Sequence, residues 1–307
     1  MKLIEAYTEI IPQGEGLEGI YKQIEISARN CYKSESFIKE GSAEKMVNAL
    51  IKRGHGSPLE HGTIYLAIPY DVATCGTKPF HKYKNNPYSK VNCGDDCDLN
   101  IAYVTTNYRV LIENNWVDDL QYLCEPTKYH EKRYTVRFIC SRSIANEVVR
   151  HRTKSFCQES QRYVNYSLDK FGNDIVCIIP KKVKDIVNDL ADTYDPIEQT
   201  RRDWLVSIPL EEAIKNYGIV LDDGIMCWYK SLEKDEADYK YLVDTCKWRP
   251  EEARGVLPND CKTDIIVTGF ASDWVHFFKL RTANGAHPDM RELACSLEME
   301  FKFKNYI

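Results

Sequence analysis

The apolar positions of this chain follow two periods, one typical of helices and the other of strands. A spacing of about 3.6 residues predicts helices, because such positions share one helix face. Segments with this spacing are residues 16–33, 42–53, 143–154, 197–216, 224–247 and 263–283. Shorter apolar or alternating runs predict strands. These runs are residues 2–8, 63–68, 101–112, 135–139 and 176–180.

Two predicted helices separate apolar from charged positions clearly. In residues 143–154 the inward side chains are expected to be Ile144, Val148 and Val149. Spacings of three and four residues then place Glu147, Arg150 and His151 on the opposite face. Residues 263–283 are expected to form one long helix with Arg281 near its end, buried through Ile266, Phe270, Trp274 and Phe278.

Glycine and proline indicate where two helices end or begin. Gly54 and Gly56 end the helix at 42–53 and place His55 in a turn. Pro250 opens a short helix that carries Arg254, because proline suits the first helical position and the acids after it suit the first turn.

Composition places the chain among ordinary soluble globular proteins, with 43% hydrophobic and 28% charged residues. A length of 307 residues allows one large core or two modest ones. No apolar run approaches the length needed to cross a bilayer. The first ten residues contain acids where a signal peptide needs an unbroken apolar core. We therefore expect a cytoplasmic protein without a membrane partner.

The twelve cysteines are scattered, which favours reduced thiols over a disulfide scaffold. Cys93 and Cys97 have the spacing of half a metal site, but no second pair lies near them, so no metal is expected. A net charge of −5 argues against a general nucleic-acid binder, which would display a basic stripe. The cations are expected to be concentrated in a pocket.

The densest group of chemically useful side chains is Arg150-His151-Arg152, followed by Ser160-Gln161-Arg162-Tyr163. The acids Glu147 and Glu159 are close in sequence. A guanidinium presents a planar fork of donors that matches a phosphate or the carbonyl edge of a base. The serine and arginine of the second segment are therefore suited to a phosphate, although a single RHR triplet is more often solvated surface.

This spacing resembles the signature of the flavin-dependent thymidylate synthases, in which RHR is followed after seven residues by Ser-x-Arg. Residues 54–61 are similar to the family segment G-H-x-[ST]-P-[FL]-E-H. Residues 253–258, 276–281 and 286–287 are similar to its A-R-x-x-L-P, H-F-x-x-L-R and A-H tail, and residues 28–32 show a weaker similarity. The resemblance spans most of residues 1–70 and 132–300.

The resemblance implies an α+β fold, a twisted and mainly antiparallel sheet packed with helices. It implies conversion of dUMP to dTMP by FAD, with 5,10-methylenetetrahydrofolate as carbon donor, NADPH as reductant and no enzymic nucleophile. A homotetramer with active sites shared between subunits is also implied. Within a single domain of residues 1–307, residues 71–131 are expected to be an insertion in the form of an extended hairpin, with turns at 85–87 and 93–94 and a short helix at 116–123.

For the flavin and its phosphates, the resemblance implies a set of cofactor-binding residues. They are Ser57, Arg150, His151, Arg152, Gln158 and His276. His55 resembles a catalytic histidine near the isoalloxazine ring. A histidine in a turn is alternatively a surface or capping residue, and Glu60 with His61 is alternatively an internal hydrogen-bonded pair that holds the turn.

A second set is implied for the nucleotide. It comprises Glu147, Arg150, Gln158, Glu159, Ser160, Gln161, Arg162, Arg254 and Arg281. Arg254 is expected to come from another subunit. Arg281 is implied to be catalytic, stabilising negative charge at N3 and O4 of uracil, because a guanidinium fixed beforehand needs no solvent reorganisation. Either arginine is alternatively a partner of a helix surface or dipole.

Five positions depart from the family pattern. They are Glu147 (commonly glutamine), Cys157 and Gln158 (commonly Asn-Glu), and Phe270 and Ser272 (commonly Asn and Arg). These departures leave open a second hypothesis, a flavin-dependent hydroxymethylase or other deoxypyrimidine-modifying enzyme. A third hypothesis is a nucleic-acid-binding protein, which the acidic charge disfavours.

Cys157 lies among arginines, as a nucleophilic thiolate would, but we expect it to be a packing residue.

Overall fold

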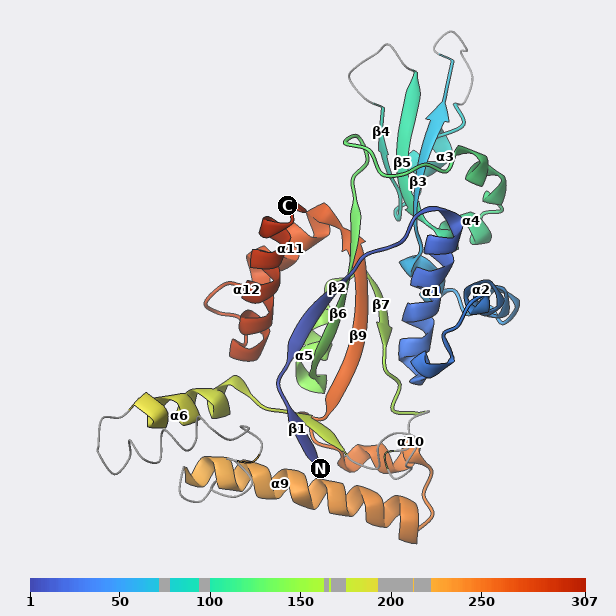
Figure 1. The fold of residues 1–307 in the computed structure, drawn as a ribbon. Helices are drawn as coiled ribbons and strands as arrows, with labels where there is room; N and C mark the ends of the chain where they lie inside the picture. Colours follow the sequence, from blue (N-terminus) through green and yellow to red (C-terminus); the bar gives the residue numbers. More distant parts are fainter. Residues whose placement is uncertain (72–77, 94–99, 163–165, 167–174, 193–211, 213–221) are drawn as a thin grey trace.

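The computed structural model describes residues 1–71, 78–93, 100–162, 166, 175–192, 212 and 222–307. In this part of the chain, helices surround two antiparallel sheets and one parallel pair of strands (Figure 1). The expected α+β fold, with mainly antiparallel sheet, is therefore confirmed. Every helix among these residues is too short or too polar to span a membrane.

The central sheet has four antiparallel strands. In spatial order they are β2 (Tyr7–Ile11), β6 (Arg133–Ser141), β9 (Lys262–Phe270) and β7 (Ser155–Gln158). Thr268 of β9 lies opposite both Thr135 of β6 and Ser155 of β7. Because side chains alternate across a strand, this register sorts the residues of the sheet onto two faces.

One face of the central sheet is apolar and packs against three helices. They are α5 (Arg142–Val148), α11 (Ala271–Arg281) and α12 (Pro288–Phe303). Val136, Phe138 and Val267 point into this core from the strands. Trp274 of α11 is fully buried there, and its indole nitrogen donates to the Tyr134 carbonyl at 3.2 Å.

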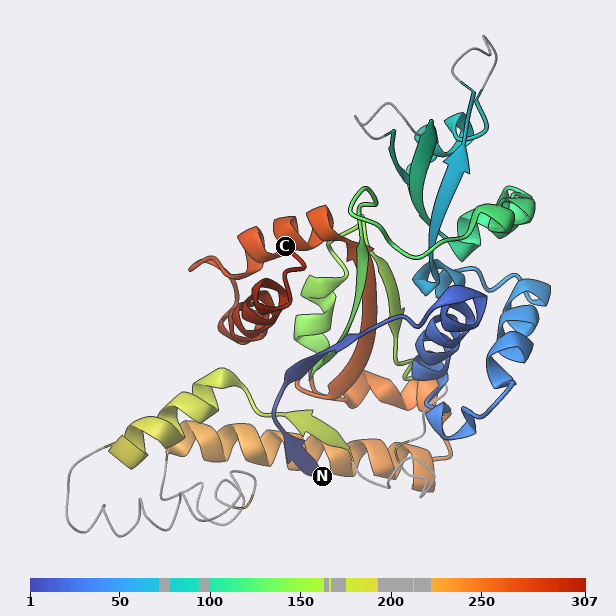
Figure 2. The same cartoon turned by 45° about the horizontal axis from the view of Figure 1, so that its top comes forward.

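The opposite face is polar and is covered by α1 (Gly16–Tyr32) and η2 (Ser57–His61). His61 Nδ1 lies 2.8 Å from Thr268 Oγ1, which lies 2.8 Å from Thr135 Oγ1. Asn30 of α1 donates to the carbonyls of Cys157 and Asp264. We call this row of contacts the polar seam. Its residues are Asn30, Cys31, His61, Arg133, Thr135, Arg137, Ser155, Cys157, Asp264 and Thr268. Figure 2 shows α11 and α12 on one side of the central sheet and α1 on the other.

A second core joins α1 and α2 (Ser42–Lys52) to a three-stranded antiparallel sheet. The sheet has the order β3 (Thr63–Pro69), β5 (Ile101–Asn107), β4 (Lys90–Asn92). Short helices in this part of the protein are η1 (Glu35–Phe37), between α1 and α2, and α3 (His81–Lys84), α4 (Tyr108–Glu113) and η3 (Val117–Tyr122). Residues 78–93 and 100–131 thus add strands and helices that share a core with α1. Their status as an insertion stays a prediction.

A third core lies at the end of the molecule near the N-terminus (Figure 1). There β1 (Lys2–Ile4) pairs in parallel with β8 (Val176–Ile178), beside α6 (Lys181–Asp192) and α9 (Asp223–Lys240). α9 continues as a π-helix, η5 (Tyr241–Thr245), and leads to α10 (Pro250–Ala253) and η6 (Arg254–Val256). As expected, Pro250 stands at the start of its helix and Arg254 follows within the next turn.

The prediction of one helix over residues 263–283 is wrong. Residues 262–270 form β9, and the helix begins only at Ala271. The strand is buried on both faces, and its Ile266 and Phe270 continue the four-residue spacing of Trp274 and Phe278 in α11, which satisfies a helical period. Its β-branched residues fit a pleated sheet better than a helix.

The helix predicted at 143–154 is too long, because α5 ends at Val148. Val149, expected to face inward, is 36% exposed, whereas His151, expected to face outward, is buried. The chain turns there and re-enters the sheet as β7. The strand at 101–112 ends at Asn107, and α4 follows it.

The sequence reasoning did not identify β7, α6 or α12. The helix predicted at 197–216 lies, apart from Glu212, outside the described residues, as does Cys97 of the half metal site. In the described part, the ten cysteines are free and no cluster of metal-ligating side chains occurs.

Trp274→Ala is expected to lower the free energy of unfolding by about 3–5 kcal/mol, because it leaves a cavity in the core beneath the central sheet. Val275→Ala is the matched control on the same helix, since Val275 is 51% exposed, and its effect should stay below about 0.5 kcal/mol. Urea denaturation of both variants measures the difference. Equal losses would contradict the placement of α11.

Candidate functional site

Arg281, at the end of α11, meets the end of α5. Its Nη1 donates to Glu147 Oε2 at 2.6 Å, and its Nη2 donates to the Glu147 carbonyl at 2.9 Å. Its Nε donates to His151 Nε2 at 2.9 Å. Three protein acceptors therefore orient the guanidinium, while its side chain remains 17% exposed.

His151, in the middle of the RHR segment, is a neutral acceptor for Arg281. Its pKa is lowered to about 4, first by burial and then by the charges of Lys154, Arg281 and His276. The ring is therefore uncharged near neutral pH. Because Nε2 accepts from Arg281, the ring proton must lie on Nδ1. The ring packs edge-on against Phe277, with 4.9 Å between centroids.

Lys154, two residues beyond RHR, is a buried lysine that bonds to a carbonyl. Its Nζ donates to the Asp273 carbonyl at 2.9 Å and lies 4.7 Å from the ring centroid of Trp274. Burial lowers its pKa to about 7, although the charge of Asp273 acts in the opposite direction. Its chain passes over Gly269, where a Cβ would lie 2.8 Å from Lys154 Cγ. Lys154 thus connects the RHR segment to the start of α11.

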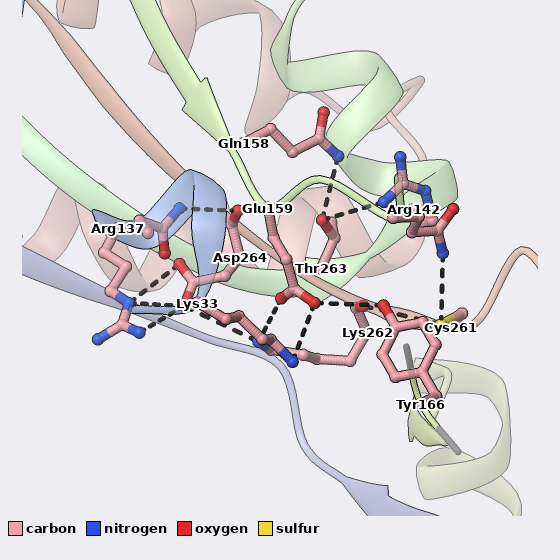
Figure 3. Close-up of polar contacts among 12 residues, drawn as sticks. Lys33, Arg137, Arg142, Gln158, Glu159, Tyr166, Cys261, Lys262, Thr263 and Asp264 are labelled. Carbon is pink, nitrogen blue, oxygen red and sulfur yellow. Dashed lines mark hydrogen bonds and ion pairs between the residues drawn. The ribbon is translucent and has the colours of Figure 1, made fainter. Parts of the chain in front are cut away.

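Gln158 and Gln161 are held by neighbours at the start of β9 and just before it. The Gln158 Nε2 donates to Thr263 Oγ1 at 3.1 Å, and Arg142 donates to the same oxygen (Figure 3). Gln161 is buried, with its Nε2 3.8 Å from Cys261 Sγ. Both amides therefore help to fix the segment that follows β7.

Glu159 points into the protein and is 2% exposed. Lys33 lies 3.0 Å from its Oε1, Lys262 lies 2.9 Å from its Oε2, and the Tyr166 hydroxyl donates to Oε1 at 3.2 Å (Figure 3). Burial favours the neutral acid, but the two lysines outweigh it, so the pKa of Glu159 is lowered. The structure makes Glu159 an internal anion that anchors the segment.

Ser160 and Arg162 lie nearer the surface. The Ser160 N–H donates to the Cys31 carbonyl at 3.1 Å, and Ser160 Oγ accepts from the Arg162 N–H at 3.3 Å. The exposed Arg162 side chain lies 3.5 Å from Glu251 of α10. Arg254, also exposed, follows Glu251 by one helical turn. Arg162 and Arg254 are therefore associated with the same short helix.

The turn at residues 54–61 contacts β7 through its serine. Gly54 has φ 68°, in the left-handed region that ends a helix, and His55 next to it is exposed. Ser57 Oγ donates to the Phe156 carbonyl at 3.3 Å. Glu60 pairs with Arg109 at 2.6 Å, whereas the buried His61 bonds within the polar seam. These two side chains hold the turn through separate partners rather than through each other.

Arg133 connects this turn to β7. Its Nη1 donates to the Glu60 carbonyl at 3.0 Å, and its Nη2 donates to Ser155 Oγ at 3.3 Å. Burial lowers the pKa of Arg133 to about 10, which leaves it charged near neutral pH. The guanidinium also lies 5.5 Å from the ring centroid of Phe270, one of the positions that depart from the family pattern.

Other predicted site residues lie on the open surface of the protein. Arg150, Arg152 and His276 are exposed, and the His276 ring lies 6.4 Å from that of His151. The structure thus brings together Glu147, His151, His276 and Arg281, and separately places Arg162 beside α10. Two cavities of the described part, of about 240 and 890 Å³, lie elsewhere, one beside Arg133 and one between α1 and α2.

Three supporting groups were missed from the sequence: Lys154, Arg133 and the pair of lysines around Glu159. Lys154 lies two residues after the RHR motif, and this closeness in sequence was the one available signal. Arg133 and the lysines gave none, because each acts by contacting a residue that is distant in sequence.

The family model and the curated relatives that match this sequence point to the same family. The sequence model of the family described as thymidylate synthase complementing protein matches residues 128–304, which include the motifs at 150–162, 253–258 and 276–287. Curated relatives are flavin-dependent thymidylate synthases. The one from Clostridium tetani is 30% identical over 163 residues, 53% of this chain and 55% of its own length. The one from Mycobacterium avium is 31% identical over 154 residues, 50% of this chain and 51% of its own.

The chain spans about half the length of the curated relatives it matches. Among solved structures, the UMP/dUMP methylase PolB from Streptomyces cacaoi, bound with 5-Br dUMP, is similar at a TM-score of 0.42 and 15% identity. That similarity covers 99% of this chain and 93% of that one.

Lys154→Met is expected to change the pH dependence of stability. The folded-state pKa near 7 lies below the ordinary value of 10.5, so the unfolded chain binds more protons between these values. By linkage, the wild-type free energy of unfolding gains up to ~1.4 kcal/mol per pH unit across this window from Lys154, and nothing below it. The stability of the methionine variant relative to wild type should therefore be highest at or below pH 7 and fall as the pH rises.

Urea denaturation at several pH values across this window measures the effect. Lys279→Met, an exposed lysine of α11, is the control and should show no such trend. If the difference in free energy of unfolding between Lys154→Met and wild type does not change with pH, the pKa of Lys154 is not lowered in the folded protein.

Proposed function

The chain belongs to the family of thymidylate synthase complementing proteins, and we propose that it is a flavin-dependent thymidylate synthase. The reaction is the conversion of dUMP to dTMP, with 5,10-methylenetetrahydrofolate as carbon donor and NADPH as reductant. The observation that supports it most directly is the orientation of Arg281 by Glu147 and His151. That contact joins the H-F-x-x-L-R and RHR motifs, which lie far apart in the sequence.

Arg281 is the proposed electrostatic catalyst. A guanidinium has five N–H donors, and three of those on Arg281 bond to Glu147 and His151. The other two remain to contact N3 and O4 of the uracil ring. Because the neutral His151 adds no positive charge, the charge of Arg281 is offset only by Glu147. A cation fixed in this way stabilises negative charge on the ring, which makes C5 more nucleophilic.

The side chains around the RHR segment fit a flavin with a pyrophosphate. Arg150 and Arg152 are exposed cations on either side of the buried His151, and they are suited to phosphate. Further proposed contacts come from Ser57, Gln158 and His276, with His55 near the isoalloxazine ring. When bound, FAD supplies the hydride that the reaction needs.

The segment after β7 is proposed to hold the nucleotide phosphate. Ser160 offers a hydroxyl and Arg162 a guanidinium fork, and Arg254 adds a second cation. Glu159 and Gln161 contribute by anchoring this segment from inside the protein. We propose a homotetramer with shared active sites, because one protomer leaves these cations on its open surface.

The chemistry of Cys157 supports a reaction without an enzymic nucleophile. Its side chain is 3% exposed, and its pKa is raised by the hydrogen bond to Cys31 and by burial. A thiol in this state is a poor nucleophile. Cys157 is thus unsuited to attack C6 of the pyrimidine.

Arg281→Ala is expected to lower kcat for thymidylate formation by about 10²–10³, the cost of removing one preorganised charge donor. Flavin binding should be largely retained, because the exposed Arg150 and Arg152 remain. Product formation is measured by mass spectrometry and flavin binding by absorbance. Lys279→Ala, on the exposed side of the same helix, is the control and should keep full activity. Unchanged turnover in Arg281→Ala would refute the proposed role.

The same mass measurement separates the proposed product from its alternatives. A methyl group on the pyrimidine supports a thymidylate synthase, whereas a hydroxymethyl group would identify the hydroxymethylase hypothesis as correct. A protein that bound no flavin but bound DNA or RNA would favour the nucleic-acid hypothesis.

A further inference from the structure

The polar seam contains two thiols, Cys31 at the end of α1 and Cys157 in β7, that the proposed reaction does not use. Two hydrogen bonds hold their backbones together. Asn30 Nδ2 donates to the Cys157 carbonyl at 3.2 Å, and the Ser160 N–H donates to the Cys31 carbonyl at 3.1 Å. The two thiols lie close enough to shift each other's pKa in opposite directions. The end of α1 is thus fixed against β7, with the two cysteines as neighbours.

The two thiols differ in exposure and in acidity. Cys31 is partly exposed, whereas Cys157 is buried. Their mutual hydrogen bond is the largest cause that lowers the pKa of Cys31, against burial and the charge of Asp264. The same bond raises the pKa of Cys157, and burial adds to it. Cys31 is therefore the accessible thiol that ionises first. Cys157 is the buried thiol that keeps its proton.

We propose that Cys31 and Cys157 form a thiol modification site that hydroperoxides oxidise to a disulfide. An accessible thiolate beside a second thiol is the arrangement on which reversible cysteine oxidation depends. Cys31 reacts with the peroxide, and Cys157 resolves the product.

The reaction balances with hydrogen peroxide as the oxidant. The Cys31 thiolate attacks one peroxide oxygen, so that an S–O bond forms, the O–O bond breaks and the departing hydroxide takes up a proton as water. The Cys157 sulfur then attacks the sulfenic sulfur of Cys31. An S–S bond forms, the S–O bond breaks and the Cys157 proton leaves with the hydroxide as a second water. Two thiols lose two electrons, and one peroxide gains them.

Other cysteines of the described part differ from this pair. Cys177 and Cys261 also face each other across an isolated bridge, but both are buried and the pKa of each is raised, that of Cys261 to about 11. They should therefore resist peroxide. Cys227 and Cys246 are exposed on the surface and serve as internal references for unassisted oxidation.

Oxidation of Cys31 and Cys157 should also change the candidate site, and this consequence rests on the proposed function. Ser57 lies beside the Cys157 thiol and donates to the neighbouring Phe156 carbonyl, and the Cys31 carbonyl accepts from the Ser160 N–H. A disulfide withdraws the Cys157 sulfur from Ser57 and changes the end of α1. The reduced and oxidised forms should therefore differ in flavin binding.

The test exposes the full chain to a small excess of hydrogen peroxide and maps the cysteines by mass spectrometry without reduction. A peptide that links Cys31 to Cys157, formed at least about tenfold faster than Cys227 or Cys246 is oxidised, is the expected result. In Cys157→Ser a sulfenic acid should accumulate at Cys31, where dimedone traps it. In Cys31→Ser the linked peptide should be lost, with circular dichroism confirming that both variants are folded.

Oxidation of Cys31 no faster than that of Cys227 and Cys246, with no linked peptide, would overturn the site. Failure of dimedone to label Cys31 in folded Cys157→Ser would overturn the assigned roles.

A flavin titration before and after peroxide tests the consequence. Weaker binding in the oxidised protein, restored by dithiothreitol and absent in Cys31→Ser, is expected. Equal flavin affinity in the two forms would refute the coupling. A reduced protein that binds no flavin at all would instead refute the proposed function, and the thiol chemistry would still be decided by the peptide map.

Discussion

A buried carboxylate, Asp264 in the central strand β9, holds together the elements that carry the candidate site. Its side chain is 4% exposed and receives the guanidinium of Arg137 from β6 at 2.9 and 3.0 Å. Its carbonyl accepts from Asn30 of α1 and from the Glu159 N–H beyond β7. Removing the partner of a buried charge costs several kcal/mol, about 3–5 in measured cases. The relative positions of α1, β6 and β9 are therefore strongly constrained.

These contacts of Asp264 determine how residues 159–162, which follow β7, are oriented. Because side chains alternate along β7, Cys157 faces the seam and Gln158 faces away from it, towards Thr263. Just beyond the strand, the Glu159 N–H bonds to the Asp264 carbonyl and the Ser160 N–H to the Cys31 carbonyl. Lys33 and Lys262 neutralise the buried Glu159 from two different elements. On the other face of the sheet, a neutral His151 and a buried Lys154 connect RHR to α11. The candidate site thus depends on charges that are compensated inside the protein, while the cations proposed to bind ligands stay exposed.

The sequence predicted those elements whose periodicity is set locally. The helices α1, α2 and α9 lie close to their predicted positions, because each has one apolar side and one polar side. The strands β3 and β6 do so because their apolar, aromatic and β-branched residues form short runs typical of strands. β9 was mistaken for a helix because a strand buried on both faces loses its alternation. The extent of α5 was wrong because the inward turn of His151, towards Arg281 and Phe277, is a tertiary contact.

The sequence by itself determined the kinds of side chain that the candidate site offers and the family to which the chain belongs. Both depend only on which residues occur and how far apart they are along the chain. Only the tertiary structure decided which of those side chains face solvent and which are held inside. It gave Glu159 an internal role, placed Arg281 on Glu147 and His151, and brought the segments of Cys31 and Cys157 together. The physical reason is that burial and charge pairing depend on neighbours brought together by folding, and no local spacing encodes those neighbours.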